Sequence, residues 1–246
     1  MILELLPLGI LVGLISGFFG IGGGTVLVPI LLFLGFDMKE AVAISIMQML
    51  FSSIYGSYLN SKTYNSIFKD GLLIGFGGAI GGMLSGFIVA AVSSYFLEML
   101  FTIIIIYTLI KILFIKTKDE HTNETKETHP YLLMLIGVFV GMLAMSIGIG
   151  GSILITPILA AYLGYNLKHA SSLGLFFVIF SSMSGFLSFS INGQMLLFEG
   201  AMVGLGSFIG VYYGIKIKHR THITHFKKYN IVLYTLILSY MLYKVL

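Results

Sequence analysis

The sequence predicts an all-α polytopic membrane protein of two inverted repeats, each a broken re-entrant helical hairpin followed by three transmembrane helices. This prediction depends on the composition, an internal repeat, and the distribution of Lys and Arg. Of the 246 residues, 57% are hydrophobic and 10% are charged, and the mean hydropathy is +1.00. A soluble domain carries about 25% charged residues. The composition therefore excludes a cytosolic globular enzyme and, despite a pI near 9.1, a nucleic-acid-binding protein.

The chain begins with an apolar segment that we expect to remain in the folded protein. Residues 1–7 contain no Lys or Arg, and Glu4 is their only charged residue. The apolar run continues to Phe36, whereas a signal peptide has an apolar core of roughly 7–15 residues after a basic start. The first segment is therefore interpreted as a structural element.

An internal repeat divides the chain. Residues 9–31 align with residues 137–159 without a gap. The matched pairs include Gly20 with Gly148, Gly22 with Gly150, Gly23 with Gly151, and Pro29 with Pro157. We expect a first transmembrane repeat at residues 1–115, a polar cytoplasmic linker at 116–130, and a second transmembrane repeat at 131–246. The linker reads KTKDEHTNETKETHP and is interpreted as a solvated connector.

The first element of each repeat is an apolar segment with glycines in its middle. The segment 5–34 is interrupted at residues 20–24, and the segment 131–163 is interrupted at residues 148–152. Each Gly inside a helix costs about 1 kcal/mol relative to Ala, so these clusters are expected to unwind the helix. The pieces that remain rise 1.5 Å per residue and are too short to cross a hydrocarbon core about 30 Å thick.

Three uninterrupted apolar spans follow each broken segment. Their expected ranges are 41–59, 71–92 and 98–115 in the first repeat, and 169–190, 199–217 and 228–245 in the second. Each is close to the length of about 20 residues that a transmembrane helix needs.

The distribution of Lys and Arg chooses between two topologies. If each broken segment crossed the membrane once, the repeats would be parallel and the basic residues would divide evenly between the two sides. If each segment returns as a re-entrant hairpin, all but Lys39 and Lys244 of the 14 Lys and Arg residues fall on one side. The positive-inside rule favours the second topology. We therefore expect a multi-pass protein of the cell (inner) membrane with both termini outside and the linker 116–130 in the cytoplasm.

The two glycine breaks predict a solute site. Interrupted helices in inverted repeats are typical of secondary transporters, and irregular backbone is tolerated in a membrane where protein buries it or where it lines a cavity. The half-helices would restart near Thr25 and Ser152, where free N–H groups and the helix dipole favour an anion. The alternatives are that Thr25 and Ser152 act as N-caps and that the glycines serve close helix packing. Close packing is the preferred interpretation for Gly77, Gly78, Gly81 and Gly82.

Polar residues of the second and sixth spans complete the candidate site, although each Ser can instead bond its own helix backbone. The candidate substrate-binding residues are Gly22, Gly23, Gly24, Thr25, Gly150, Gly151, Ser152, Ser45, Gln48, Ser52, Ser172 and Ser181. The core is expected to lack Lys, Arg, Asp, Glu and His, which would make anion binding weak and transient. The six histidines are assigned to polar loops. No catalytic residue, metal ligand or cofactor is predicted, and the protein is not expected to be an enzyme.

The segments GFFGIGGG, at residues 17–24, and VPIL, at residues 28–31, resemble the sulfite exporter TauE/SafE family, also called the TSUP transporters. The second copy, from Ser146 to Ser152 with Pro157, is similar to the repeat of that family, with Ser152 in place of the third glycine. The resemblance covers essentially the whole chain. It implies an integral membrane transporter of anionic sulfur or carbon compounds that works as a secondary carrier.

The predicted function is a secondary membrane transporter that exports small organic or inorganic anions, such as sulfite, sulfonate or related sulfur compounds, by alternating access. Two alternatives stay open: a passive channel for small anions or neutral solutes, and a membrane scaffold without transport. The expected partners are a small anionic solute and the lipid bilayer, and no nucleic acid. The solute, the direction, the coupling ion and assembly into a homo-oligomer are left open.

Overall fold

The computed structural model describes residues 2–61, 67–114, 129–165 and 167–245, and the regular elements in these ranges are helices. The first repeat contains α1 (Ile2–Phe19), α2 (Gly24–Phe33), α3 (Met38–Ser61), α4 (Ile67–Ala91) and α5 (Ser94–Phe114). The second contains α6 (Pro130–Ser146), α7 (Ser152–Tyr162), α8 (Leu167–Ile191), α9 (Leu197–Arg220) and α10 (Ile223–Val245). The predicted linker lies outside the described residues except for its last two, and Pro130 already begins α6.

Both predicted helix breaks are confirmed. Helix α1 ends at Phe19 and α2 begins at Gly24, while α6 ends at Ser146 and α7 begins at Ser152. The breaks consist of matched glycines with positive φ, a backbone conformation that other residues rarely adopt. The φ values are 69°, 81° and 87° at Gly20, Gly22 and Gly23, and 71°, 80° and 70° at Gly148, Gly150 and Gly151.

Helices α3, α4, α5, α8 and α9 each contain a stretch that is long and apolar enough to cross a membrane, and they are the 5 such helices in the described part of the chain. Helices α1, α2, α6 and α7 are apolar but shorter, as the breaks require. The predicted span 228–245 is helical, within α10, but α10 is not among the five. Lys228, Asn230 and several Tyr residues lower its hydropathy.

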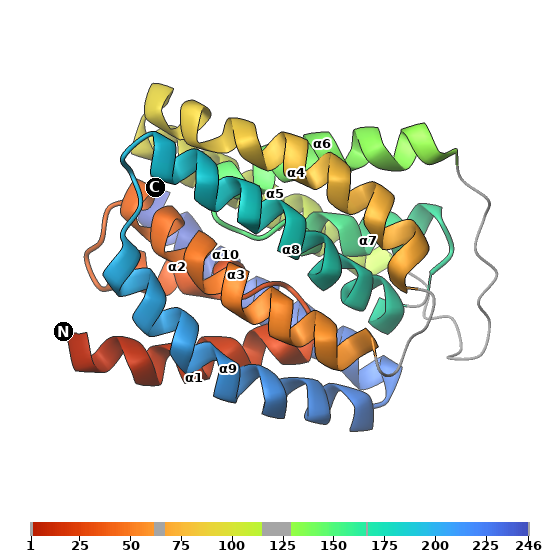
Figure 1. Ribbon diagram of the computed structural model, residues 1–246. Coiled ribbons are helices and arrows are strands. Elements are labelled where there is room, and N and C mark those ends of the chain that lie inside the picture. The colour runs from red at the N-terminus through yellow and green to blue at the C-terminus, as the bar shows by residue number, and fades with distance from the viewer. Residues whose placement is uncertain (1, 62–66, 115–128, 166, 246) are drawn as a thin grey trace.

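Glycines allow two pairs of helices to pack backbone against backbone. Helix α1 runs parallel to α9, and α6 runs parallel to α4 (Figure 1). Ten glycines lie so close to the partner helix that an added Cβ would overlap its backbone. They are Gly9, Gly13 and Gly17 of α1, Gly206, Gly210 and Gly214 of α9, Gly77 and Gly81 of α4, and Gly137 and Gly141 of α6. This is the small-residue packing common between membrane helices, and it confirms the close-packing interpretation of Gly77 and Gly81.

Helices α3 and α8 cross the middle of the bundle. Helix α3 packs along α9, α8 packs along α4, and α3 and α8 also meet each other. Figure 1 shows α1 and α9 below this central pair and α4 and α6 above it, with the start of α1 and the end of α10 at the same end of the bundle. The half-helices α2 and α7 pack on α3 and α8. The breaks that precede them are therefore held in the centre of the molecule.

Candidate solute site between the helix breaks

The two helix breaks touch each other. A Cβ on Gly24 would overlap the carbonyl oxygen of Gly148, so the backbones are in direct contact there. The Thr25 hydroxyl donates a hydrogen bond of 3.2 Å to the carbonyl of Ile149, across 124 positions of sequence. The predicted candidates Gly22, Gly23, Gly24, Thr25, Gly150, Gly151 and Ser152 are all buried in this contact region. The irregular backbone is thus covered by protein, as membrane-embedded loops require.

Neither half-helix has a side-chain cap. The N-cap residues are Gly23 for α2 and Gly151 for α7, and neither start shows a side-chain cap hydrogen bond. The alternative of Thr25 and Ser152 as N-caps is therefore wrong, because each follows its cap. In α2 the first helical bonds are donated by Val26 and Leu27 to the Gly23 carbonyl. Since the N–H groups before them have no intrahelical acceptor, the start of α2 offers donors and a positive dipole end to a ligand.

Gln48 of α3 places a polar side chain against the start of α2. It is fully buried, and its Oε1 would overlap a Cβ on Gly23. Neither Oε1 nor Nε2 has a hydrogen-bond partner among the described residues. A buried amide without partners is costly, so this side chain marks a place where a ligand would supply the missing hydrogen bonds. Gln48 therefore lies against the first break.

The predicted serines differ in their hydrogen bonds. Ser52 donates to the Gly22 carbonyl at 3.2 Å and therefore supports the first break. Ser181 donates to Phe177 and Val178 of its own helix, so it adds no donor to the site. Ser45 and Ser152 have buried hydroxyls without partners among the described residues, and they remain candidates for a ligand.

Thr156 of α7 is a buried polar residue that sequence reasoning missed. Its hydroxyl has no partner among the described residues, and it lies with Ser152 over Gly174 of α8. The signal was present in the sequence, because Thr156 follows Ser152 by one helical turn and thus shares its face.

The expectation of a core without charged residues is wrong. Lys218 has no exposed surface, and Lys168 and His169 are each 6% exposed. Helix α8 begins at Leu167 and α9 continues to Arg220, so these residues belong to buried helix ends rather than to polar loops. The candidate Ser172 joins this group: its hydroxyl donates to the Lys168 carbonyl at 3.0 Å and accepts from Lys218 Nζ at 2.9 Å. Histidines at the ends of helices α8 and α9 likewise contradict the assignment of all six to loops.

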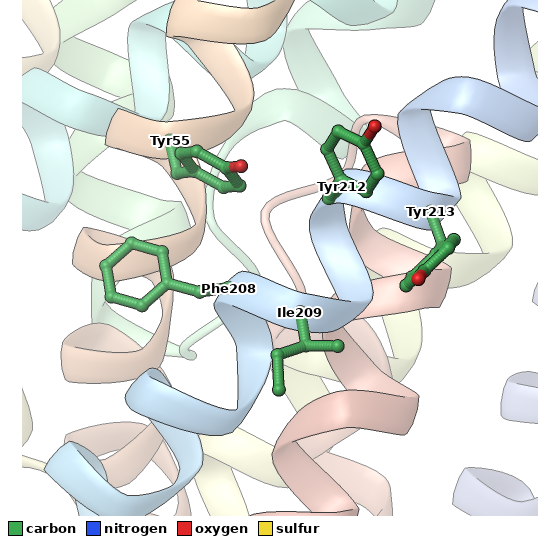
Figure 2. A pocket seen from close by; sticks show the side chains of 5 residues that line it. All are labelled: Tyr55, Phe208, Ile209, Tyr212 and Tyr213. Atoms are coloured by element: carbon green, nitrogen blue, oxygen red, sulfur yellow. The ribbon is translucent and has the colours of Figure 1, made fainter.

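A hollow of about 550 Å³ lies on the outer surface of α3 and α9 rather than at the breaks. Figure 2 shows its lining, with Tyr55 from α3 and the other residues from α9: Phe208, Ile209, Tyr212 and Tyr213. The rings of Tyr55 and Phe208 pack edge to face with centroids 5.5 Å apart. Exposed aromatic and aliphatic side chains on a membrane-length helix are suited to lipid contact, so we do not assign this hollow to the solute.

Membrane-length helices around two touching helix breaks define a multi-pass membrane protein of the transporter class. The chain belongs to the sulfite exporter TauE/SafE family, whose model matches residues 5–241. It is 33% identical over 199 residues to a probable membrane transporter protein of Methanocaldococcus jannaschii, covering 76% of this chain and 73% of that protein.

Two further relatives carry the same description. A probable membrane transporter protein of Haemophilus influenzae is 28% identical over 200 residues, which is 78% of this chain and 75% of that protein. Another, YdhB of Bacillus subtilis, is 27% identical over 211 residues, which is 84% of this chain and 86% of that protein. No solved structure matches the chain.

Proposed function

We propose that this protein is a secondary transporter that exports small anions, such as sulfite, sulfonates or related sulfur compounds, by alternating access. The observation that carries the proposal is the contact between the two glycine breaks beside the Gln48 amide, which has no hydrogen-bond partner in the described part of the chain. An anion there would accept hydrogen bonds from the first N–H groups of α2 and from Gln48 Nε2, and the dipole of α2 would favour its charge. The description of the matching family, sulfite exporter, supports sulfite as the first solute to test.

The helix pairing supports alternating access. In the internal repeat, α1 corresponds to α6 and α4 corresponds to α9. The glycine-packed pair α1 and α9 therefore corresponds to the glycine-packed pair α6 and α4. We take the two repeats to be inverted relative to each other. In our proposal, the group α1, α3 and α9 then moves as a unit against the group α4, α6 and α8. The breaks between the groups would be exposed to each side of the membrane in turn.

Counterflow in proteoliposomes tests this function. Liposomes that contain the purified protein are loaded with unlabelled sulfite and placed in a trace of radiolabelled sulfite without oxygen. A carrier accumulates label transiently, and its initial rate saturates with the sulfite concentration. A channel gives flux that neither saturates nor shows counterflow, and a scaffold gives no flux beyond that of empty liposomes. Either of these two results contradicts the proposal.

A further inference from the structure

Lys218 is a buried cation without a counter-charge in the described part of the chain. Its ammonium lies in α9, has no exposed surface and donates a hydrogen bond of 2.9 Å to the Ser172 hydroxyl. The charged groups that act on it are themselves basic, since it lies within electrostatic range of Lys168 and of His219. Burying an ammonium beside other basic groups is strongly unfavourable, so the amine either gives up its proton or takes up an anion as counter-charge. Ionisable residues inside a membrane bundle mark functional sites for this reason.

The geometry leaves hydrogen-bonding capacity for such an anion. An ammonium has three donors, and Ser172 accepts one of them. The Ser172 hydroxyl donates its own hydrogen to the Lys168 carbonyl, so its lone pairs stay directed at Lys218. The other two donors of Lys218 have no acceptor among the described residues and therefore remain for a ligand.

The cluster lies next to the first helix break. Ser171, the neighbour of Ser172, packs against Gly20, with its Oγ 3.1 Å from the place where a Cβ on Gly20 would lie. Gly17, at the end of α1, packs on Val211, two turns before Lys218 in α9. Lys218 thus lies between the first break and the end of the bundle where α9 ends and α8 begins.

We propose that Lys218, Ser172 and Lys168 form a second anion site, separate from the contact between the breaks, that binds a small oxyanion with more than one negative charge. The ammonium binds the oxyanion directly, Ser172 holds the ammonium in place, and Lys168 adds positive potential. Because Lys218 has no exposed surface, the oxyanion can enter or leave the site only when the start of α8 and the end of α9 separate. The site would hold the solute on its way to or from the breaks, and this role rests on the proposed function. Binding of the oxyanion at Lys218 does not depend on that function.

Equilibrium dialysis of the purified full-length protein against radiolabelled sulfite, without oxygen, tests the site. Wild-type protein is expected to bind one sulfite more per chain than the Lys218→Met variant. Lys216→Met is the matched control, because Lys216 is an exposed cation on the same helix, and it should bind as much as wild type. If Lys218→Met binds as much sulfite as wild type, the inference is wrong.

Two further measurements cover the case in which Lys218→Met does not fold. Ser172→Ala keeps the ammonium and loses its hydroxyl partner, so sulfite affinity at this site should fall roughly tenfold; unchanged affinity contradicts the inference. Sulfite should also raise the apparent Tm of wild type more than that of Ser172→Ala, since a ligand stabilises the folded state it binds. Equal shifts contradict it.

Failure of this inference can be told apart from failure of the proposed function by comparing Lys218→Met with Gln48→Leu. If only Gln48→Leu loses a bound sulfite, the site at the breaks stands and the second site does not. If only Lys218→Met loses one, the second site stands and the assignment of the transport site to the breaks fails.

Discussion

The side-chain amide of Gln48 lies directly against Gly23, in the space that a Cβ on that glycine would need. The register that aligns Lys39 with Lys168 also aligns Gln48 with Phe177, and the Phe177 ring lies in the same way against Gly151. The two breaks are therefore matched in backbone and different in chemistry. An amide with no hydrogen-bond partner among the described residues lies against the first break, and an aromatic ring lies against the second.

Replacing Gln48 with Leu should weaken sulfite binding and stabilise the protein. The two side chains are similar in size, but Leu has no donor for the anion and no unsatisfied polar atom. Removing a buried unpartnered amide is worth about 1–3 kcal/mol, so the apparent Tm without sulfite should rise. Gln194→Leu makes the same change in the α8–α9 loop and should leave sulfite binding unaltered. Equal loss in both variants would show that the effect is not local to the break.

Replacing Gly24 with Ala should abolish transport by forcing the breaks apart. The new Cβ would overlap the Gly148 carbonyl oxygen, and neither backbone can move without displacing a half-helix. Overpacking of this kind costs about 1–3 kcal/mol. Gly193→Ala is the control, since Gly193 has a φ of 66° but nothing within 4 Å of its Cβ position. Sulfite transport in proteoliposomes should be lost in the first variant and kept in the second; transport by Gly24→Ala would contradict the contact.

The glycines of the two helix pairs should be equally intolerant of Ala. At Gly210 a Cβ would overlap the Ile10 carbonyl, and at Gly81 it would overlap the Val138 carbonyl. Both variants should lower the apparent Tm, because the helices must separate. Gly185→Ala should have a much smaller effect, since its Cβ would meet only the flexible Met145 side chain, at 3.3 Å. Thermal unfolding in detergent measures all three, and a Gly185→Ala shift as large as the others would argue against backbone contact as the cause.

Cysteine labelling should place the two ends of the bundle on opposite sides of the membrane. The chain contains no Cys, so a single introduced thiol is the only target. Thr122→Cys, in the predicted linker, should react with an impermeant reagent only from the cytoplasm. Asn192→Cys, between α8 and α9, should react only from outside. Labelling of both from one side would contradict the re-entrant topology.

The helix breaks could be predicted from the sequence because their cause is local. A residue with positive φ in the middle of an apolar segment is nearly always Gly, and Gly22 and Gly150 stand at matched positions of the repeat. The contact of the two breaks followed from the repeat itself. The serines were less predictable: Ser52 reaches the first break as well as the Met49 carbonyl of its own helix, while Ser181, its match, bonds only its own helix, and packing decides between the two.

The buried basic residues could not be predicted from hydropathy. A hydropathy pattern sets the end of a helix where the apolar run ends, so charged residues beyond that point are assigned to loops. Lys168 and Lys218 lie beyond the apolar spans, yet α8 and α9 continue through them and neighbouring helices bury them. The difference between Gln48 and Phe177 was also hidden, since it depends on which face of α3 and α8 points at the breaks.

Counterflow by the Gln48→Leu variant tests the central claim most directly. Wild-type and variant protein are reconstituted at equal density, loaded with unlabelled sulfite and exposed to radiolabelled sulfite without oxygen. If the touching breaks hold the solute, wild type shows saturable counterflow and Gln48→Leu shows little or none while remaining folded and inserted. Counterflow of equal rate and saturation in both proteins would contradict the claim.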